Sequence, residues 1–412
     1  MKTDLDELMH SNNLDAILIT GPAQHNPAMV YMTGGGHLTN ADLIKKRGEP
    51  AVLFHYPMER DEAARSGLRT RNIAEYKLSE LLKQNNGNTL KATVNRYQLM
   101  LGELGISSGN IALYGRSEIG TNYAIFSALQ DAMPGLHLIG EIDTSVLMLA
   151  RMTKDGSEID RIRKMGSITT QVVGLAADFI SSHKAKNGIV LKTDGEPLTI
   201  GEVKSKIDMW LSERGAENPE GTIFAIGRDA GVPHSSGNPD DLLTLGQTIV
   251  FDIFPCEAGG GYYYDFTRTW SLGYATDEVL KLYEDVSAVY TQVTQALEVG
   301  KPFKDYQEMT CQLFSSRGHP TVKDDQQTQQ GYVHSLGHGI GLNVHERPWS
   351  GVSSDAWDCL VPGSVFTIEP GLYYPEKNMG VRLENSYWVT PDGKIEMLAE
   401  YPMDLVLPVK SA

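Results

Sequence analysis

The chain has 412 residues and a formal net charge of −16 at pH 7, with 41% hydrophobic and 21% charged residues. This is the composition of an ordinary globular protein that is too long for one compact core, so we expect two domains. The acidic balance argues against a nucleic-acid partner, because phosphate binding requires a basic surface.

The sequence shows no sign of secretion or of a membrane span. Its first residues are polar and acidic, and no run of about 18 apolar residues occurs. Cys256, Cys311 and Cys359 are widely spaced and form neither a disulfide framework nor a CxxC motif. We therefore expect a cytoplasmic protein with reduced thiols and no membrane partner.

The first 150 residues or so alternate short apolar strands with helical patterns. This alternation predicts an α/β domain with a mixed or parallel sheet. Because the glycines at 34–36 do not follow a strand in the manner of a nucleotide-binding fingerprint, we expect a structural and assembly role. The predicted elements are a helix at Leu5–Ser11, strands at 15–20, 51–54 and 111–114, and a turn at Tyr31–Gly36.

The boundary between the two domains is predicted near Arg151–Ser157. Ser157–Asp160 and Thr199–Glu202 both have the form of a capping box, and each precedes apolar residues at helical spacing. Further helices are predicted through 279–293 and 306–313. We interpret the apolar faces of all four helices as core surfaces.

A strand–glycine–strand segment contains two aspartates in unusual places. Its arms, 249–254 and 262–270, are rich in β-branched and aromatic residues and flank a glycine cluster, which predicts a hairpin. Asp252 and Asp265 each interrupt an otherwise apolar arm. A buried carboxylate is costly unless a positive group meets it, so a facing pair suggests a bound cation. For either aspartate alone, a solvated position at a strand end is the alternative.

Three of the eleven histidines, His334, His338 and His345, lie within twelve residues of one another. Clustering of this kind favours a metal or catalytic site over a structural role. The glycines at 337, 339 and 341 argue against a continuous zinc-binding helix. We therefore expect a turn that brings backbone and imidazole close to a ligand.

Two later apolar segments contain one glutamate each. Ser364–Gly371 contains Glu369, Gly380–Val389 contains Glu384, and both segments are predicted to be strands. Arg382 is expected on the same face as Glu384, because side chains alternate along a strand. Four strands with one inward carboxylate each indicate a shared site rather than scattered surface charges.

The five predicted metal ligands are Asp252, Asp265, His338, Glu369 and Glu384. Their four carboxylates balance the charge of two divalent cations, and without cations they would raise one another's pKa. Oxygen-rich ligation with one imidazole and no thiolate suits Mn²⁺, with Co²⁺, Fe²⁺ or Zn²⁺ as alternatives. Two such ions can activate a water molecule and polarise a carbonyl, which is the chemistry of amide hydrolysis. No GxSxG motif supports a serine hydrolase instead.

Four segments of the sequence resemble one enzyme family. FDIFPCEAGGGYYYDFTRT, HSLGHGIGLNVHE, TIEPGLYY and GVRLEN are similar to motifs of the pita-bread metallopeptidases (peptidase family M24), which include methionine aminopeptidase, aminopeptidase P and prolidase. The resemblance covers about 155–412. LDAILIT and YMTGG more weakly resemble the N-terminal domain shared by creatinase, prolidase and aminopeptidase P, which favours the proline-directed branch.

This resemblance implies a fold and a domain organisation. Residues 1–152 would form a creatinase-like α/β domain. Residues 153–412 would form an α+β pita-bread catalytic domain, with a curved antiparallel sheet flanked by helices.

The resemblance also implies a role for each matching residue. Asp252 would bind one metal ion, and His338 and Glu369 the other, with Asp265 and Glu384 bridging the two. Glu369 would also carry a proton from the bridging water to the leaving nitrogen. In the substrate pocket, His234 would stabilise the tetrahedral intermediate, His345 would face the scissile carbonyl or the proline ring, His334 would line the pocket, and Arg382 would lie beside Glu384 as a supporting group. The alternative for His234 and His334 is plain pocket packing.

The sequence departs from the family pattern in two places. The two aspartates lie two residues further apart than is common in the family, and the glycine turn can absorb this difference. In prolidases an arginine between the VHE and EPG segments helps to hold the free carboxylate of a dipeptide. Between Pro348 and Gly363 this chain has no arginine. Preference for dipeptides over longer peptides therefore stays open.

The resemblance implies a homodimeric enzyme that acts on small peptides and hydrolyses the bond between an N-terminal residue and proline, as an Xaa-Pro dipeptidase or an Xaa-Pro aminopeptidase. One alternative is a metal-dependent lyase of the same fold that acts on a small sulfonium acid. Another is a metal-free member, either creatinase-like or a binding module. The presence of all five ligands counts against the metal-free alternative.

Overall fold

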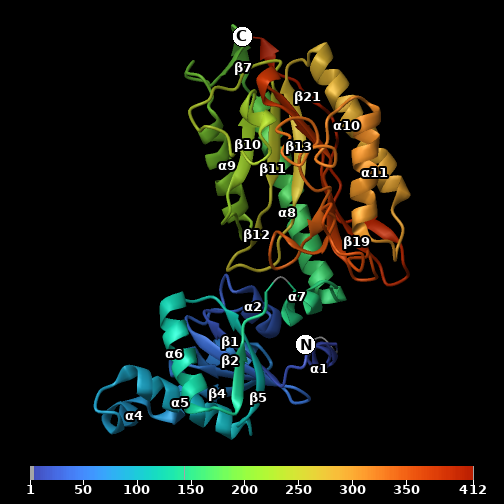
Figure 1. The fold of residues 1–412 in the computed structure, drawn as a ribbon. Helices are drawn as coiled ribbons and strands as arrows, with labels where there is room; N and C mark the ends of the chain where they lie inside the picture. The colour runs from blue at the N-terminus through green and yellow to red at the C-terminus, as the bar shows by residue number, and fades with distance from the viewer. Residues whose placement is uncertain (1–3, 143, 412) are drawn as a thin grey trace. The chain divides into compact units, whose positions relative to one another are not determined.

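The computed structural model describes residues 4–142 and 144–411 (Figure 1). The chain divides into two compact units, Met1–Arg151 with Gly259–Gly261 and Met152–Ala258 with Tyr262–Ala412. Among the described residues, no helix combines the length and hydropathy that a membrane span requires.

The first unit is an α/β unit. Its helices are α1 (Leu5–Ser11), α2 (Pro27–Thr33), α3 (Arg60–Arg65), α4 (Leu78–Gln84), α5 (Thr89–Glu103), α6 (Ile119–Ala132) and α7 (Val146–Arg151), with 3₁₀ turns η1 (Pro57–Glu59) and η2 (Ile73–Tyr76). Its strands are β1 (Ala16–Gly21), β2 (Ala41–Lys46), β3 (Val52–His55), β4 (Arg69–Asn72), β5 (Gly109–Gly115) and β6 (Leu136–Ile139). The predicted first helix and three predicted strands are thereby confirmed within one or two residues.

The described strands of this unit form a six-stranded mixed sheet in the order β4-β3-β2-β1-β5-β6. Strand β1 pairs antiparallel with β2 and parallel with β5. Leu18 belongs to one buried apolar cluster, and its neighbours Ile17 and Ile19 belong to another. Since side chains alternate along a strand, both faces of the sheet are covered. The predicted mixed sheet is confirmed.

The turn predicted at Tyr31–Gly36 is wrong in its first half, because Tyr31 to Thr33 form the end of α2. The helix begins after Asn26, whose side chain accepts a hydrogen bond from the Met29 backbone at 3.4 Å, and Pro27 occupies its first turn. Gly34 ends the helix in the left-handed region, with a φ of 82°. The glycines therefore mark a helix terminus.

The second unit contains the site. Its helices are α8 (Gly156–Ser181), α9 (Ile200–Glu213), α10 (Asp277–Ala296) and α11 (Phe303–Ser316), with 3₁₀ turns η3 (Asp229–Gly231) and η4 (Pro375–Lys377). Its strands are β7 (Lys184–Lys186), β8 (Ile189–Leu191), β9 (Ala216–Glu217), β10 (Thr222–Ile226), β11 (Thr248–Ile253), β12 (Cys256–Glu257), β13 (Phe266–Leu272), β14 (His338–Gly339), β15 (Glu346–Trp349), β16 (Val365–Ile368), β17 (Gly371–Tyr374), β18 (Met379–Arg382), β19 (Asn385–Val389), β20 (Ile395–Met397), β21 (Val406–Leu407) and β22 (Lys410–Ser411). The predicted helices are all present.

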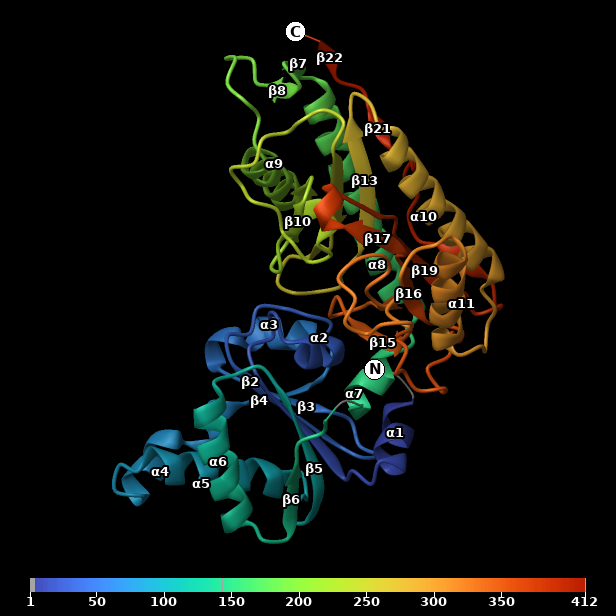
Figure 2. The same ribbon diagram turned by 45° about the horizontal axis from the view of Figure 1, so that its top comes forward.

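Two sheets of this unit carry the predicted ligands. They have the strand orders β10-β11-β13-β21 and β15-β14-β16-β19-β20, and the short ladder β17-β18 accompanies them. Helix α9 contacts α8 and β10, whereas α10 and α11 lie side by side and contact β15, β17 and β18 (Figures 1 and 2). Strands β11 and β13 pair antiparallel, which confirms the predicted hairpin.

A buried apolar cluster holds the strands of the second sheet against α10 and α11. Val286 and Val293 of α10 and Phe303 of α11 are fully buried in it, together with Phe366 and Ile368 of β16. The apolar faces predicted for these helices are therefore core surfaces. Because β16 leads directly into the Glu369 segment, this core fixes one side of the site.

The N-cap of α8 lies two residues before the predicted one. Asp155, not Ser157, caps the helix, and its carboxylate accepts hydrogen bonds from the backbone of Ser157 and Glu158 at 3.0 Å each. The Glu158 carboxylate accepts one from the Asp155 backbone at 2.8 Å. The prediction at Ser157 is wrong because aspartate also serves as an N-cap. The second predicted box, Thr199–Glu202, is confirmed.

Replacing Asp155 with alanine is expected to lower the free energy of unfolding of the second unit by about 1 kcal/mol, because two backbone donors lose their acceptor. All five tryptophans lie in this unit, so the denaturant midpoint followed by tryptophan fluorescence measures it. Ser157→Ala is the matched control and should change stability by no more than about 0.5 kcal/mol. A larger loss of stability in Ser157→Ala would mean that Ser157, not Asp155, caps the helix.

Candidate metal centre

The predicted ligands lie where strands end or break. Asp252 lies within β11 and pairs with Thr267, but Asp265 precedes β13 by one residue. Glu369 separates β16 from β17, and Glu384 separates β18 from β19. The prediction that every carboxylate lies inside a continuous strand is therefore right for Asp252 and wrong for the other three.

Two of the breaks have an identifiable cause, the first in the local sequence and the second in a tertiary contact. Pro370 follows Glu369 and has no N–H to donate to a ladder, so β16 cannot continue. The Glu384 backbone donates to the Thr267 carbonyl at 3.1 Å, which ties this point of the chain to β13 rather than to its own ladder. The carboxylates at the three breaks, Asp265, Glu369 and Glu384, line one cavity.

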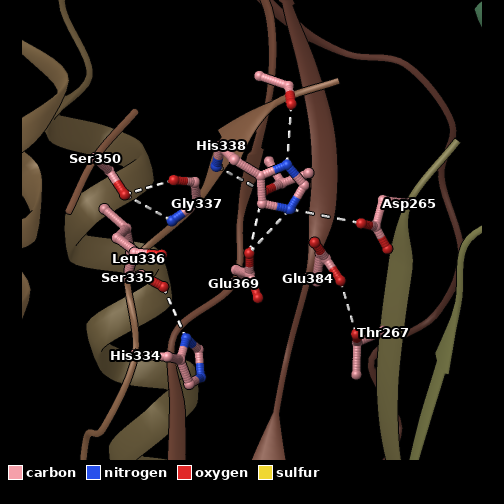
Figure 3. A network of polar contacts seen from close by, with 12 residues as sticks. Asp265, Thr267, His334, Ser335, Leu336, Gly337, His338, Ser350, Glu369 and Glu384 are labelled. Atoms are coloured by element: carbon pink, nitrogen blue, oxygen red, sulfur yellow. Dashed lines mark hydrogen bonds and ion pairs between the residues drawn. The ribbon is translucent and has the colours of Figure 1, made fainter. Parts of the chain in front are cut away.

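The structure brings the predicted side chains together. Nε2 of His338 lies 3.6 Å from Oδ2 of Asp265 and 3.3 Å from Oε1 of Glu369. Donor atoms of Asp265, His338 and Glu384 lie within 4.8 Å of one another. Figure 3 shows the carboxylates of Asp265, Glu369 and Glu384 around the His338 ring. Asp252 lines the same cavity.

Hydrogen bonds from outside the cluster orient these side chains. Nδ1 of His338 lies 3.0 Å from the Gly339 carbonyl, so an imidazole that donates there keeps Nε2, which faces the carboxylates, available to bind a cation between them. The Thr267 hydroxyl donates to Oε2 of Glu384 at 2.7 Å. The Thr367 hydroxyl donates to Oε1 of Glu369 at 3.4 Å. This arrangement leaves ligand atoms facing inward.

Three carboxylate oxygens of the cluster have no hydrogen-bond partner, which bears on whether the cluster fits cations. Oδ1 of Asp252, Oδ1 of Asp265 and Oε1 of Glu384 are buried and accept no hydrogen bond from the described residues. Burial, together with the neighbouring carboxylates, raises the pKa values of Asp265 and Glu384 well above their ordinary range. Buried hydrogen-bond acceptors without a hydrogen-bond donor are rare and costly. A set of carboxylate oxygens with one imidazole is also a ligand set that divalent cations prefer, so the cluster fits such cations.

The family model for metallopeptidase family M24 matches residues 160–391, a range that contains all five side chains of the cluster. The chain belongs to metallopeptidase family M24. The family uses divalent metal ions, and the buried Asp/His/Glu cluster of this M24 chain is compatible with them.

Curated and solved relatives agree with this assignment. The chain is 29% identical over 282 residues to the probable dipeptidase PepE of Mycobacterium tuberculosis, which covers 66% of this chain and 68% of that protein. An uncharacterized peptidase of Staphylococcus aureus is 28% identical and covers 96% of this chain and 97% of its own length. The structure resembles an Xaa-Pro dipeptidase from Bacillus anthracis with a TM-score of 0.73, 22% identity and coverage of 98% and 99% of the two chains. It resembles an X-Pro aminopeptidase from Thermotoga maritima with a TM-score of 0.72, 23% identity and coverage of 98% of both chains. These similarities confirm the expected pita-bread fold.

A buried polar chain connects Asp252 of this M24 centre with His334. The Arg382 guanidinium forms an ion pair with Asp252 and donates to the Tyr373 hydroxyl at 2.7 Å. The Tyr373 oxygen lies 2.8 Å from Nε2 of His334, whose Nδ1 lies 2.7 Å from the Ser335 carbonyl. Since burial lowers the pKa of His334, its imidazole is neutral and accepts the tyrosine proton at Nε2. This series of polar contacts thus holds one oxygen of Asp252 and fixes the orientation of the His334 ring.

The remaining predicted residues line one cavity of about 610 Å³ with the metal centre. His234 follows η3 at the surface of this cavity. The His345 ring lies 4.3 Å from the His338 ring, centroid to centroid. The structure therefore brings together every side chain that the resemblance selected, although it does not assign their roles.

Four residues that matter for the site were not singled out from the sequence. Thr267, Thr367 and Tyr373 hold ligands or their partners, as described above. Arg268, which is 1% exposed, donates to the backbone carbonyls of Thr267 and Glu384 at 2.9 Å each. Its position between the aromatic residues Phe266 and Trp270 of a predicted strand was a signal, because a buried charge needs partners. For the threonines and the tyrosine, no local pattern distinguishes this role from ordinary strand packing.

Proposed function

We propose that this M24 chain is a dinuclear metallopeptidase that hydrolyses the bond between an N-terminal residue and proline. The observation that carries the proposal is the convergence of four carboxylates and one imidazole in a 610 Å³ cavity. The names of its relatives, dipeptidase, Xaa-Pro dipeptidase and X-Pro aminopeptidase, support the substrate class.

In this proposal, Asp252, Asp265, His338, Glu369 and Glu384 would hold two divalent ions. When bound, such ions lower the pKa of a water molecule and polarise the scissile carbonyl. Glu369 would accept a proton from the attacking water molecule and deliver it to the leaving nitrogen. His234 and His345, which line the same cavity, stabilise the carbonyl oxygen as negative charge develops.

The choice between dipeptides and longer peptides depends on how a substrate carboxylate is held. Arg347 is the nearest arginine to the segment where prolidases carry theirs. Its guanidinium forms a buried ion pair with Asp358 and lies 4.3 Å from the Trp357 ring centroid. It is therefore occupied, and carboxylate recognition has to come from another residue or be absent.

The proposal predicts that protein loaded with Mn²⁺ releases the first residue from Ala-Pro, from Ala-Pro-Ala or from both. Free alanine quantified by chromatography measures the reaction, and Ala-Ala-Ala is the control for proline specificity. The lyase alternative is tested with dimethylsulfoniopropionate in the same preparation. Turnover of the sulfonium acid, with both peptides left intact by metal-loaded protein, would contradict the peptidase proposal.

We further propose Mn²⁺ as the native metal, a cytoplasmic location and a homodimer. The oxygen-rich donor set with one imidazole supports manganese. Cys256, Cys311 and Cys359 are unpaired, as expected in a reducing compartment. The homodimer rests on the resemblance alone. Metal analysis of protein purified without chelator and light scattering of the same sample test the metal and the assembly.

A further inference from the structure

The described lining of the catalytic cavity includes two cationic side chains, Lys204 and Arg382. Arg382 is engaged by Asp252, by Tyr373 and by the Pro233 carbonyl at 3.2 Å. Lys204 lies on α9, and its Nζ donates to the Ser236 carbonyl at 3.0 Å. Within the described chain no ion pair links Lys204 to a carboxylate, and Asp208 acts on its charge without forming one.

The surroundings of Lys204 favour an anionic partner. Burial lowers the pKa of its ammonium group, and the charge of Asp208, four residues further along α9, only partly opposes this effect. A carboxylate brought to Nζ would offset the loss of hydration and form a charge-assisted hydrogen bond. A control lysine, Lys206, lies on the same helix but is exposed.

Lys204 lines the same cavity as Asp252. Residues 220–223, which include the first two residues of β10, also line it. Ile223 pairs with Asp252 across β10 and β11. Glu220, the acidic residue of this segment, is exposed and forms no described ion pair with Lys204. The ammonium group and the metal ligands thus face one continuous space.

We propose that Lys204 binds a carboxylate of the peptide substrate. This inference rests on the proposed function and specifies its substrate class. The carboxylate has two possible sources, the free C-terminus of an Xaa-Pro dipeptide or the side chain of an acidic first residue. Both sources give the same contact with Nζ. Peptides that carry only one of the two carboxylates distinguish between them.

The test compares Ala-Pro with Ala-Pro-amide, and Glu-Pro-amide with Gln-Pro-amide. Dissociation constants are measured by calorimetry on Mn²⁺-loaded protein that carries Glu369→Gln, and kcat/KM is measured on protein with Glu369 intact. Each measurement is made with Lys204, with Lys204→Met and with Lys204→Arg. Lys206→Met is the matched control, since it removes an exposed lysine from the same helix.

Lys204→Met should weaken binding about tenfold for one carboxylate-bearing peptide and leave its amide partner unchanged, with Lys204→Arg close to wild type. A loss of affinity confined to Ala-Pro identifies the C-terminus, and a loss of affinity confined to Glu-Pro-amide identifies the side chain.

Equal effects on all four peptides, no effect, or no binding of any peptide would overturn the inference. If a variant misfolds, the comparison within each pair on the Lys204 protein can still overturn the inference, because equal affinity for both members of both pairs would mean that no carboxylate is recognised. Lys204-dependent binding without any cleavage would overturn the proposed function and leave this inference standing.

Discussion

Replacing Glu369 with glutamine is expected to lower kcat for a proline peptide about 1,000-fold. The carboxylate is the proposed proton carrier, and loss of a general acid–base group costs about 10²–10⁴-fold. Glutamine keeps the size of the side chain and one oxygen near Nε2 of His338, but its amide cannot accept and return a proton at neutral pH. The measurement is single-turnover kinetics on metal-loaded protein, which separates chemistry from product release.

The metal content of the same variant separates the two roles of Glu369. Asp252, Asp265, His338 and Glu384 remain, so at least one divalent ion per chain should still be found after dialysis. Glu376→Gln, at an exposed position of η4, is the matched control and should keep full activity. Activity of Glu369→Gln within tenfold of wild type would remove Glu369 as the proton carrier. Complete loss of metal would show that ligation alone explains the defect.

The sequence predicts the site because side chains that can bind metal ions occur inside segments that are otherwise apolar. Asp252 lies in β11 with apolar neighbours, and the later glutamates repeat this pattern in other apolar segments. A buried charge without a partner is costly, so this pattern predicts one shared cation site. The resemblance then supplied the roles, which spacing alone could not.

The positions that could not be predicted depend on tertiary contacts. Glu384 interrupts a run of apolar residues that looks like one long strand, and the break arises because its backbone donates to Thr267 of β13, more than 100 residues earlier. Tyr373 looked like an ordinary strand aromatic. Its hydroxyl is placed between Arg382 and His334 only after β17 and β18 have paired. Local propensity carries no information on either event.

Replacing Arg382 with methionine is expected to destabilise the metal-free second unit by about 3–5 kcal/mol. The guanidinium is 2% exposed, and its ion pair with Asp252 is buried, so truncation leaves an unpaired carboxylate inside the protein. It also removes the donors to Tyr373 and to the Thr267 hydroxyl, the latter at 3.3 Å. Denaturant midpoints by tryptophan fluorescence report this unit selectively, because every tryptophan lies in it.

Two further variants decide whether the ion pair is the cause. Asp252→Asn removes the partner charge, so the double variant with Arg382→Met should lose less than the sum of the two single changes. Arg382→Lys keeps the charge but lacks the planar fork that reaches Asp252 and Tyr373 together, so an intermediate loss is expected. Additive losses in the double variant would mean that packing of the arginine, rather than its charge, stabilises the site. A cation bound at Asp252 would neutralise part of the carboxylate charge that Arg382→Met leaves unpaired. Mn²⁺ should therefore reduce the loss of stability caused by Arg382→Met. An equal loss of stability with and without Mn²⁺ would mean that the metal does not bind at Asp252.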